Sequence, residues 1–267
     1  MGGRGASSSS AGGRGGGGGF AAGGGGFAVG GGGNSNIANQ APDPSNTPVV
    51  PNAVTVLTQM TDQQLTQLYN QSRNVDMPNH LKDVSDETQK FVFSAGLNEK
   101  PLVLDDAGFA KYLKDNNIPQ SDVLARSTSG ANYTVNGTTI TLSPKQVTDL
   151  TKYGDLNYIG GKHGGMVYGA GTYFDKNGGK PTGYSNGATM IGVLSKNAKP
   201  ISKSQLKTRT DQWSKTHPQF AKAVGPFSMR NASIYALAQG YNVITDGMGS
   251  YHNVIDRSAI VLKANNY

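Results

Sequence analysis

Apolar residues recur at helical spacing through residues 53–120, with polar residues on the opposite side of each turn. Three segments of this kind start at a hydroxyl or carboxylate side chain that can cap the first helical turn. They begin at Thr61 or Asp62, at Asp86 and at Asp105. The pattern predicts three short amphipathic helices, which we expect to form a small subdomain packed on a later sheet.

After Pro119 the pattern changes to short runs of β-branched and aromatic residues separated by glycine and asparagine, which is typical of strands. The expected strands are Val123–Arg126, a hairpin within Tyr133–Thr141, Tyr168–Phe174, Ala188–Leu194, Tyr241–Ile244, Asn253–Ile255 and Ala259–Leu262. Helices are expected at Ser143–Gly154, Ser202–Thr216 and Ala232–Gln239. Many short strands with few helices favour an α+β split sheet over a parallel doubly wound sheet.

The start of the chain has a different composition. The first 34 residues hold 18 of the 38 glycines and only two charged residues, Arg4 and Arg14. Such a segment buries too little apolar surface to offset its backbone entropy. We therefore expect a disordered tail and proline-rich linker over residues 1–52, a helical subdomain over 53–120 and an α+β domain over 121–267.

Composition narrows the functional classes. The chain has no cysteine, and its four histidines have no metal-ligand spacing, so no metal site is expected. No apolar run is long enough to span a bilayer, and the first residues lack the order of a signal peptide, so we expect no membrane partner and a location in the cytoplasm of the producing cell. The net charge of +7 is compatible with binding to nucleic acid. The glycine-rich tail has only two arginines, which is fewer than nucleic-acid-binding segments of this kind usually contain, so nucleic acid is the least favoured partner.

The remaining positive charge is concentrated in the segment Ser195–Arg209. It is read as a solvated loop and helix face, with attraction of an anionic ligand as the alternative. The only tryptophan, Trp213, follows in the same expected helix and is interpreted as a core residue rather than a stacking platform.

Four short segments carry the functional argument. They are VLARSTSG, YGAGTYF, GYNVI and NVIDRSAIV, in this order between residues 123 and 261. The glycines of the second segment precede a β-forming sequence, so they cannot open a phosphate-binding helix as in a Rossmann fold. If a nucleotide binds, its phosphates must be held by arginine, by backbone N–H groups of glycine turns, or by both.

Together these segments resemble the ADP-ribosyltransferases. VLARSTSG is similar to the first-strand arginine motif of arginine-type transferases. YGAGTYF, with Tyr184 ten residues later, resembles an element of poly(ADP-ribose) polymerase-like and phage-encoded transferase domains. The last two segments look like the closing strands of that family. The resemblance covers about Asp122 to Lys263, and a weaker one, in MGGRGASS and residues 89–106, points to phage-encoded proteins.

The resemblance implies NAD as cofactor and a set of residues around it. Arg126 would hold the dinucleotide, because a guanidinium can clamp a pyrophosphate bidentately. Gly169 and Gly171 would let the backbone approach the nicotinamide ring. Tyr173 and Tyr184 would supply aromatic faces, with Phe174 in the core.

Structural alternatives exist for several of these residues. Arg126 could instead pair with Asp122 or Asp106, and Tyr184 could close a sheet edge. His163, between glycines, could donate to a phosphate or lie in an exposed turn, which is the favoured interpretation.

The catalytic glutamate of the family is not evident. The only glutamates, Glu87 and Glu99, both precede Arg126. Aligning NVID with the penultimate strand places Tyr251 or His252 at that position, and Asp246 is the nearest carboxylate upstream. Arg126, Asp246 and His252 are therefore the candidate catalytic residues.

Two functions remain from this reasoning. The first is a phage-encoded mono-ADP-ribosyltransferase that modifies a host macromolecule, with an unidentified host protein as acceptor. The alternative is a catalytically degenerate protein of the same fold that serves as a structural or binding protein, with virion components as its partners.

Overall fold

A mixed sheet of eight strands runs through the part of the chain that the computed structural model describes, which is residues 53–77, 86–97, 99–128, 131–135, 138–154, 169–180 and 188–264. The strands lie in the order β1 (Leu102–Leu104), β10 (Ile260–Lys263), β6 (Ala188–Leu194), β2 (Leu124–Thr128), β5 (Thr172–Lys176), β9 (Tyr251–Val254), β8 (Val243–Thr245) and β7 (Pro200–Ser202). A separate hairpin joins β3 (Ala131–Val135) to β4 (Thr138–Leu142). The described residues, which begin at residue 53, belong to one compact unit.

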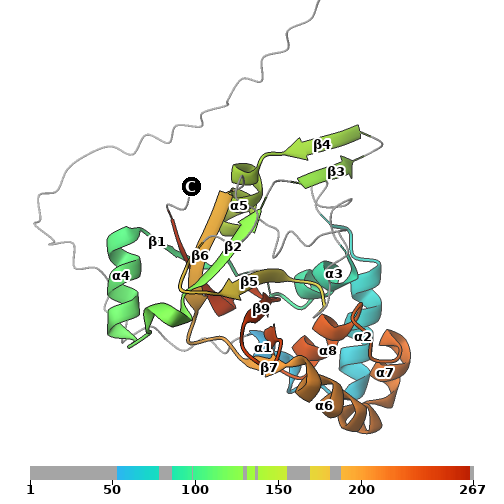
Figure 1. Cartoon of the computed structure of the whole chain (residues 1–267). Coiled ribbons are helices and arrows are strands. Elements are labelled where there is room, and N and C mark those ends of the chain that lie inside the picture. Colours follow the sequence, from blue (N-terminus) through green and yellow to red (C-terminus); the bar gives the residue numbers. More distant parts are fainter. Residues whose placement is uncertain are drawn as a thin grey trace, which may run out of the picture. The chain divides into compact units, whose positions relative to one another are not determined.

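The centre of the sheet forks between β2 and β5. Strand β2 pairs with β6 along all five of its residues. Its pairing with β5 covers only Leu124–Ala125 against Asp175–Lys176. Beyond Ala125 no further pairing between these two strands is recorded, and Figure 1 shows β2 and β5 running in different directions from there. The sheet therefore divides into the half β1-β10-β6-β2 and the half β5-β9-β8-β7.

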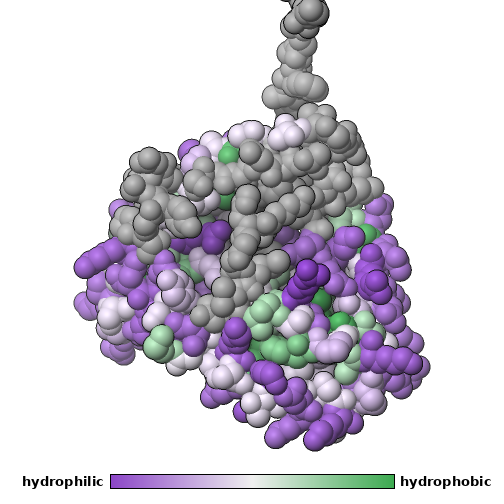
Figure 2. All heavy atoms as spheres, turned by 45° about the vertical axis from the view of Figure 1, so that its right-hand side comes forward, coloured by the Kyte–Doolittle hydropathy of each residue, from purple (hydrophilic) through white to green (hydrophobic). Residues whose placement is uncertain are grey.

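The described helices gather mainly around one end of this sheet (Figure 1). They are α1 (Ala53–Leu57), α2 (Asp62–Arg73), α3 (Glu87–Ser94), α4 (Asp106–Asp115), α5 (Pro144–Tyr153), α6 (Lys203–Thr216), α7 (Pro218–Val224) and α8 (Ala232–Ala238). All seven residues of α8 are buried, because α1, α3 and α6 pack around it. The face of this helical part in Figure 2 is largely hydrophilic, as expected from amphipathic helices with their apolar sides turned inward.

Aromatic rings fill the core between the early and the late helices. Tyr69 of α2, Phe91 of α3 and Phe220 of α7 lie with ring centroids 5.9–6.4 Å apart. Trp213 and Tyr235 extend the cluster at 5.5 and 6.0 Å from Phe220. Tilted and edge-to-face rings at this spacing add about 0.5–1.5 kcal/mol per pair beyond area burial. Trp213 is partly buried and packs against this core, so the expectation that it is a core residue is met only in part.

Two smaller cores lie on the sheet. One contains buried side chains from both halves, including Leu124, Phe174, Met190, Val254 and Leu262. The other packs Phe109 of α4 on Val123, Val193 and Val261, which covers the opposite face of β6 and β10. The prediction that Phe174 is a core residue is confirmed, since its side chain is 1% exposed.

Most predicted elements are present, in an α+β arrangement as expected. Helices α2, α3, α4, α5 and α6 begin close to where helices were predicted to start. Thr61, Asp86, Asp105, Ser143 and Ser202 each accept a backbone hydrogen bond as the N-cap. The start of β5 was wrong: it begins at Thr172 rather than Tyr168. Helices α1 and α7 and strands β1 and β7 were missed, because segments this short do not show a recognisable repeat of apolar residues.

Asp62 ties the first helices to a later one. Its carboxylate accepts hydrogen bonds from the backbone N–H groups of Gln219 at 3.0 Å and Phe220 at 2.9 Å. These are free donors in the first turn of α7, where Pro218 has no N–H and His217 supplies no side-chain cap. Asp62, a residue of α2, therefore acts as the N-cap of α7.

Replacing Asp62 should therefore destabilise the protein. We expect Asp62→Ala to lower the free energy of unfolding by about 1–2 kcal/mol, the usual cost of losing a helix cap. Urea denaturation followed by far-ultraviolet circular dichroism measures this. Asp211→Ala is the matched control, because Asp211 is exposed and forms only a surface ion pair with Lys207. Equal stability of the two variants would contradict the assigned role of Asp62.

Candidate functional site

The strands that carry the four motifs are neighbours in space. The arginine motif lies on β2, the aromatic motif on β5, NVI on β9 and GYNVI on β8, which are consecutive strands of the sheet. The end of the last motif forms β10, beside β6. Segments more than a hundred residues apart in the chain thus meet around the fork.

Arg126 lies at the fork itself, one residue past the last β2–β5 pair. Its half-buried guanidinium reaches across to β5, where Nη1 donates to the backbone carbonyl of Tyr173 at 3.1 Å. The two acids considered as alternative partners form ion pairs elsewhere. Asp122 pairs with Lys176 at 2.8 Å and Asp106 with Lys263 at 3.3 Å.

The glycines before β5 form a tightly packed turn. Gly169 and Gly171 have φ angles of +90° and +156°, which side chains rarely tolerate. A Cβ on Gly169 would lie 2.5 Å from Oγ of Ser233, and one on Gly171 would lie 2.0 Å from Oδ1 of Asn253. Packing against α8 and β9 therefore accounts for both glycines, independently of any ligand.

Side chains from three elements hold the carbonyl groups of this turn. The Tyr173 hydroxyl donates to the carbonyl of Gly169. Asn253 Nδ2 lies 3.2 Å from the carbonyl oxygen of Gly169 and 3.3 Å from that of Ala170. Ser233 Oγ donates to the carbonyl of Ala170 at 2.6 Å. The ring of Tyr173 is thereby fixed beside the point at which its own backbone meets Arg126.

Asn253 and Ser233 are residues that sequence reasoning missed. Both are completely buried polar side chains in apolar surroundings. A sequence signal was present, because a buried polar group needs a partner. Ser233 lies within the apolar run ASIYALA, and Asn253 directly precedes Val254 and Ile255. Asn253 also pairs with Tyr173 in the β5–β9 register, so it is the late-strand polar residue next to Tyr173.

His252 lies on β9 opposite Phe174 and is 8% exposed. Its Nδ1 atom is buried and makes no hydrogen bond with any residue that the structure describes. Burial lowers the pKa of His252, and nearby Lys176 lowers it further, against smaller opposing effects of Asp246 and Asp122. The imidazole therefore stays neutral to lower pH than an exposed one.

Asp246 organises the loop between β8 and β9. Its Oδ1 atom accepts hydrogen bonds from the backbone N–H groups of Met248 at 3.1 Å and Ser250 at 3.0 Å. In the described residues, neither Asp246 nor His252 forms a hydrogen bond or ion pair with Arg126. The structure thus brings Arg126 and Tyr173 into contact, with Asn253 one strand further, and does not join the three candidate catalytic residues directly.

Two candidates cannot be placed. His163 and Tyr184 lie outside the described residues, and so does the hairpin turn at 136–137. Asp256, the other late carboxylate, is 1% exposed and accepts hydrogen bonds from the backbone and hydroxyl of Ser258, so it caps a turn. Burial raises its pKa.

Among the described residues, no group of three or more acidic, histidine or cysteine side chains is arranged to hold a metal ion. None of the helices described is both long and apolar enough to cross a membrane. Comparisons with protein-family models, curated proteins and solved structures find no match for this chain.

The packing of the glycine turn gives a direct test. Gly171→Ala should destabilise the protein by several kcal/mol, because its Cβ must displace the Asn253 amide, which holds two buried carbonyl groups. Gly249→Ala is the control: Gly249 also has a positive φ, but nothing lies within 4 Å of its added Cβ. Thermal unfolding of both variants separates steric overlap from backbone strain. A smaller loss for Gly171→Ala than for Gly249→Ala would show that the turn is not packed as described.

Proposed function

We propose that this chain is an NAD-dependent mono-ADP-ribosyltransferase, encoded by a phage, that modifies a host macromolecule. The observation that carries the proposal is the meeting of the arginine and aromatic motifs at the fork. Arg126 reaches the backbone of Tyr173 from a strand that pairs with β5 over only two residues. A fork of this kind is the arrangement expected of a split sheet that receives a ligand where its halves part.

The chemistry requires few groups from the protein. Cleavage of the bond between nicotinamide and ribose builds positive charge on the sugar, as in glycoside hydrolysis. Arg126 would hold the pyrophosphate, since a guanidinium offers paired donors in a fixed plane. The turn at Gly169–Gly171 is compatible with a close backbone approach, although its carbonyl groups are already engaged. The acceptor would be an unidentified host protein.

The proposed reaction also needs an acid that stabilises the developing charge. Glu87 accepts a hydrogen bond from Tyr69 in the helical part, so it belongs to another region. Asp246 is half-buried and near enough to His252 to affect its pKa, which makes it the carboxylate best placed in the late-strand region.

A second candidate function has support from the same observations. Asp246 is engaged by its own loop, and no glutamate follows residue 99. A protein that keeps the transferase fold and binds NAD or virion components without cleaving the dinucleotide would have these features. Measuring both NAD binding and nicotinamide release distinguishes the two functions.

The test of the proposal uses the full chain and NAD labelled in both the nicotinamide and the adenine parts. Release of nicotinamide with transfer of adenine label to a host-cell extract is expected. Arg126→Ala should lower the release about a hundredfold or more, and Arg126→Lys should restore it only partly, because lysine keeps the charge and loses the planar fork. Arg73→Ala, which alters an exposed arginine on α2, is the control.

The outcome of this assay decides between the proposals. Binding of NAD without nicotinamide release supports the degenerate alternative. Neither binding nor release in the unaltered protein would rule out the transferase and the NAD-binding form of the alternative.

The role of Asp246 can be tested without disturbing its loop. Asp246→Asn keeps an Oδ1 acceptor for the N–H groups of Met248 and Ser250 but removes the negative charge. We expect nicotinamide release to fall by about a hundredfold with little change in melting temperature. Asp211→Asn on α6 serves as the exposed control. Unchanged turnover in Asp246→Asn would exclude this carboxylate from the reaction.

A further inference from the structure

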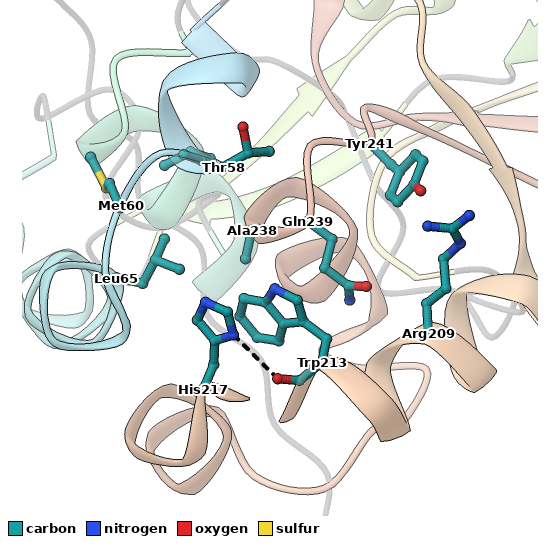
Figure 3. Close-up of a pocket in the computed structure, with 10 residues that line it drawn as sticks. Thr58, Met60, Leu65, Arg209, Trp213, His217, Ala238, Gln239 and Tyr241 are labelled. Atoms are coloured by element: carbon teal, nitrogen blue, oxygen red, sulfur yellow. Dashed lines mark hydrogen bonds between the residues drawn. The ribbon is translucent and has the colours of Figure 1, made fainter. Parts of the chain in front are cut away.

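A pocket lies in the helical part of the molecule, and none of its lining residues belongs to the proposed transferase site. It is lined by the turn after α1, by α2, by α6 and the residue that follows it, and by the end of α8 (Figure 3). Its lining includes Thr58, Leu65, Arg209, Trp213, His217 and Gln239. The pocket holds about 170 Å³ and is open to solvent on one side.

One wall of the pocket is a flat aromatic stack. The rings of Trp213 and His217 lie 3.8 Å apart and only 8° from parallel. His217 is fixed in this position because its Nδ1 atom lies 3.2 Å from the backbone carbonyl of Trp213 and 2.9 Å from the Thr216 hydroxyl. Buried Leu65 and Ala238 supply apolar surface beside the stack. This wall suits a planar apolar group.

Polar groups that can still form hydrogen bonds or ion pairs line the same pocket. Arg209 lies over the ring of Tyr241, 5.8 Å from its centroid, and makes no ion pair with any described residue. Within the same part of the chain, the Trp213 ring N–H has no acceptor. Gln239 is held in place by its Nε2 group, which donates to the Thr210 hydroxyl at 2.9 Å, and its Oε1 atom remains an available acceptor. Figure 3 shows the side chains of Arg209, Gln239 and Trp213 on one side of the pocket.

The charge near this border is positive. On α6 the acid Asp211 is engaged by Lys207 at 3.0 Å, so it does not neutralise Arg209. A guanidinium that is held against an aromatic face and lacks a carboxylate partner favours an anion. The volume of the pocket fits one ring, since a protein cavity of about 150 Å³ accepts benzene.

From these features we propose that the pocket binds a small organic anion made of one planar ring and a carboxylate one or two carbons away from it. The ring lies against the Trp213–His217 stack, and the carboxylate meets the guanidinium of Arg209 and the ring N–H of Trp213. This site is independent of the proposed NAD reaction, because it shares no residue with the fork between β2 and β5.

The experiment uses the full chain and 3-phenylpropionate as the probe. Trp213 is the only tryptophan, so its fluorescence, excited at a wavelength that the probe does not absorb, reports directly on the pocket. We expect a saturable change in emission with a dissociation constant on the order of a millimolar or below, which is reasonable for a ligand of this size. The neutral isostere 3-phenylpropanamide should bind about tenfold more weakly, because it lacks the charge that Arg209 recognises.

Variants of α6 test the assigned contact. Arg209→Gln should weaken binding of the acid about tenfold or more and leave binding of the amide nearly unchanged. Lys215→Gln changes the net charge of the same helix equally but lies outside the pocket lining, so it should leave both affinities unchanged. The emission spectra of the free variants serve as a check that the Trp213 environment is intact.

Three results would overturn the proposal. They are the absence of a saturable response to 3-phenylpropionate, equal affinity for the acid and the amide, and equal effects of Arg209→Gln and Lys215→Gln. The last would show that the probe responds to the general charge of α6 and not to the pocket.

Discussion

The turn that precedes β5 is held from three directions, and the candidate site depends on it. Asn253 from β9, Ser233 from α8 and Tyr173 from β5 itself all donate to the carbonyl groups of Gly169 and Ala170. Each of the two carbonyl groups has two donors, and because the groups are buried, losing both donors would leave an unsatisfied carbonyl at a cost of about 1–3 kcal/mol. The turn therefore fixes where β5 begins and where the backbone of Tyr173 meets the guanidinium of Arg126. The backbone geometry of this turn therefore also sets the position of the candidate site.

Helical parts of the fold could be predicted from sequence because the information is local. A hydroxyl or carboxylate followed by an apolar stripe sets the start of α2, α4 and α5 without reference to the rest of the chain. Strand β6 was also predicted with its correct bounds. The start of β5 could not be predicted in this way. The positive φ angles of Gly169 and Gly171 occur where the turn packs against α8 and β9, which are distant in sequence. The cap that Asp62 provides for α7 is likewise visible only in three dimensions.

The candidate site was predictable in outline. The order of the motifs was enough to expect Arg126 near the aromatic strand, and the pairing of β2, β5 and β9 agrees with that expectation. Asn253 was overlooked in favour of its neighbour His252, because the face on which a strand residue lies depends on register, and register was unknown. One residue of shift exchanges the two faces of a strand. The pocket beside Trp213 was not predicted, since its lining comes from four separate segments and has no periodic signal.

The central claim is that a dinucleotide is received where β2 and β5 part. Mapping the backbone amide resonances of the full chain during titration with NAD tests this most directly. The account predicts saturable shifts at Arg126, Tyr173 and Asn253, with the α6 resonances around Trp213 unaffected. Shifts confined to the helical part, or the absence of any saturable shift, would contradict it.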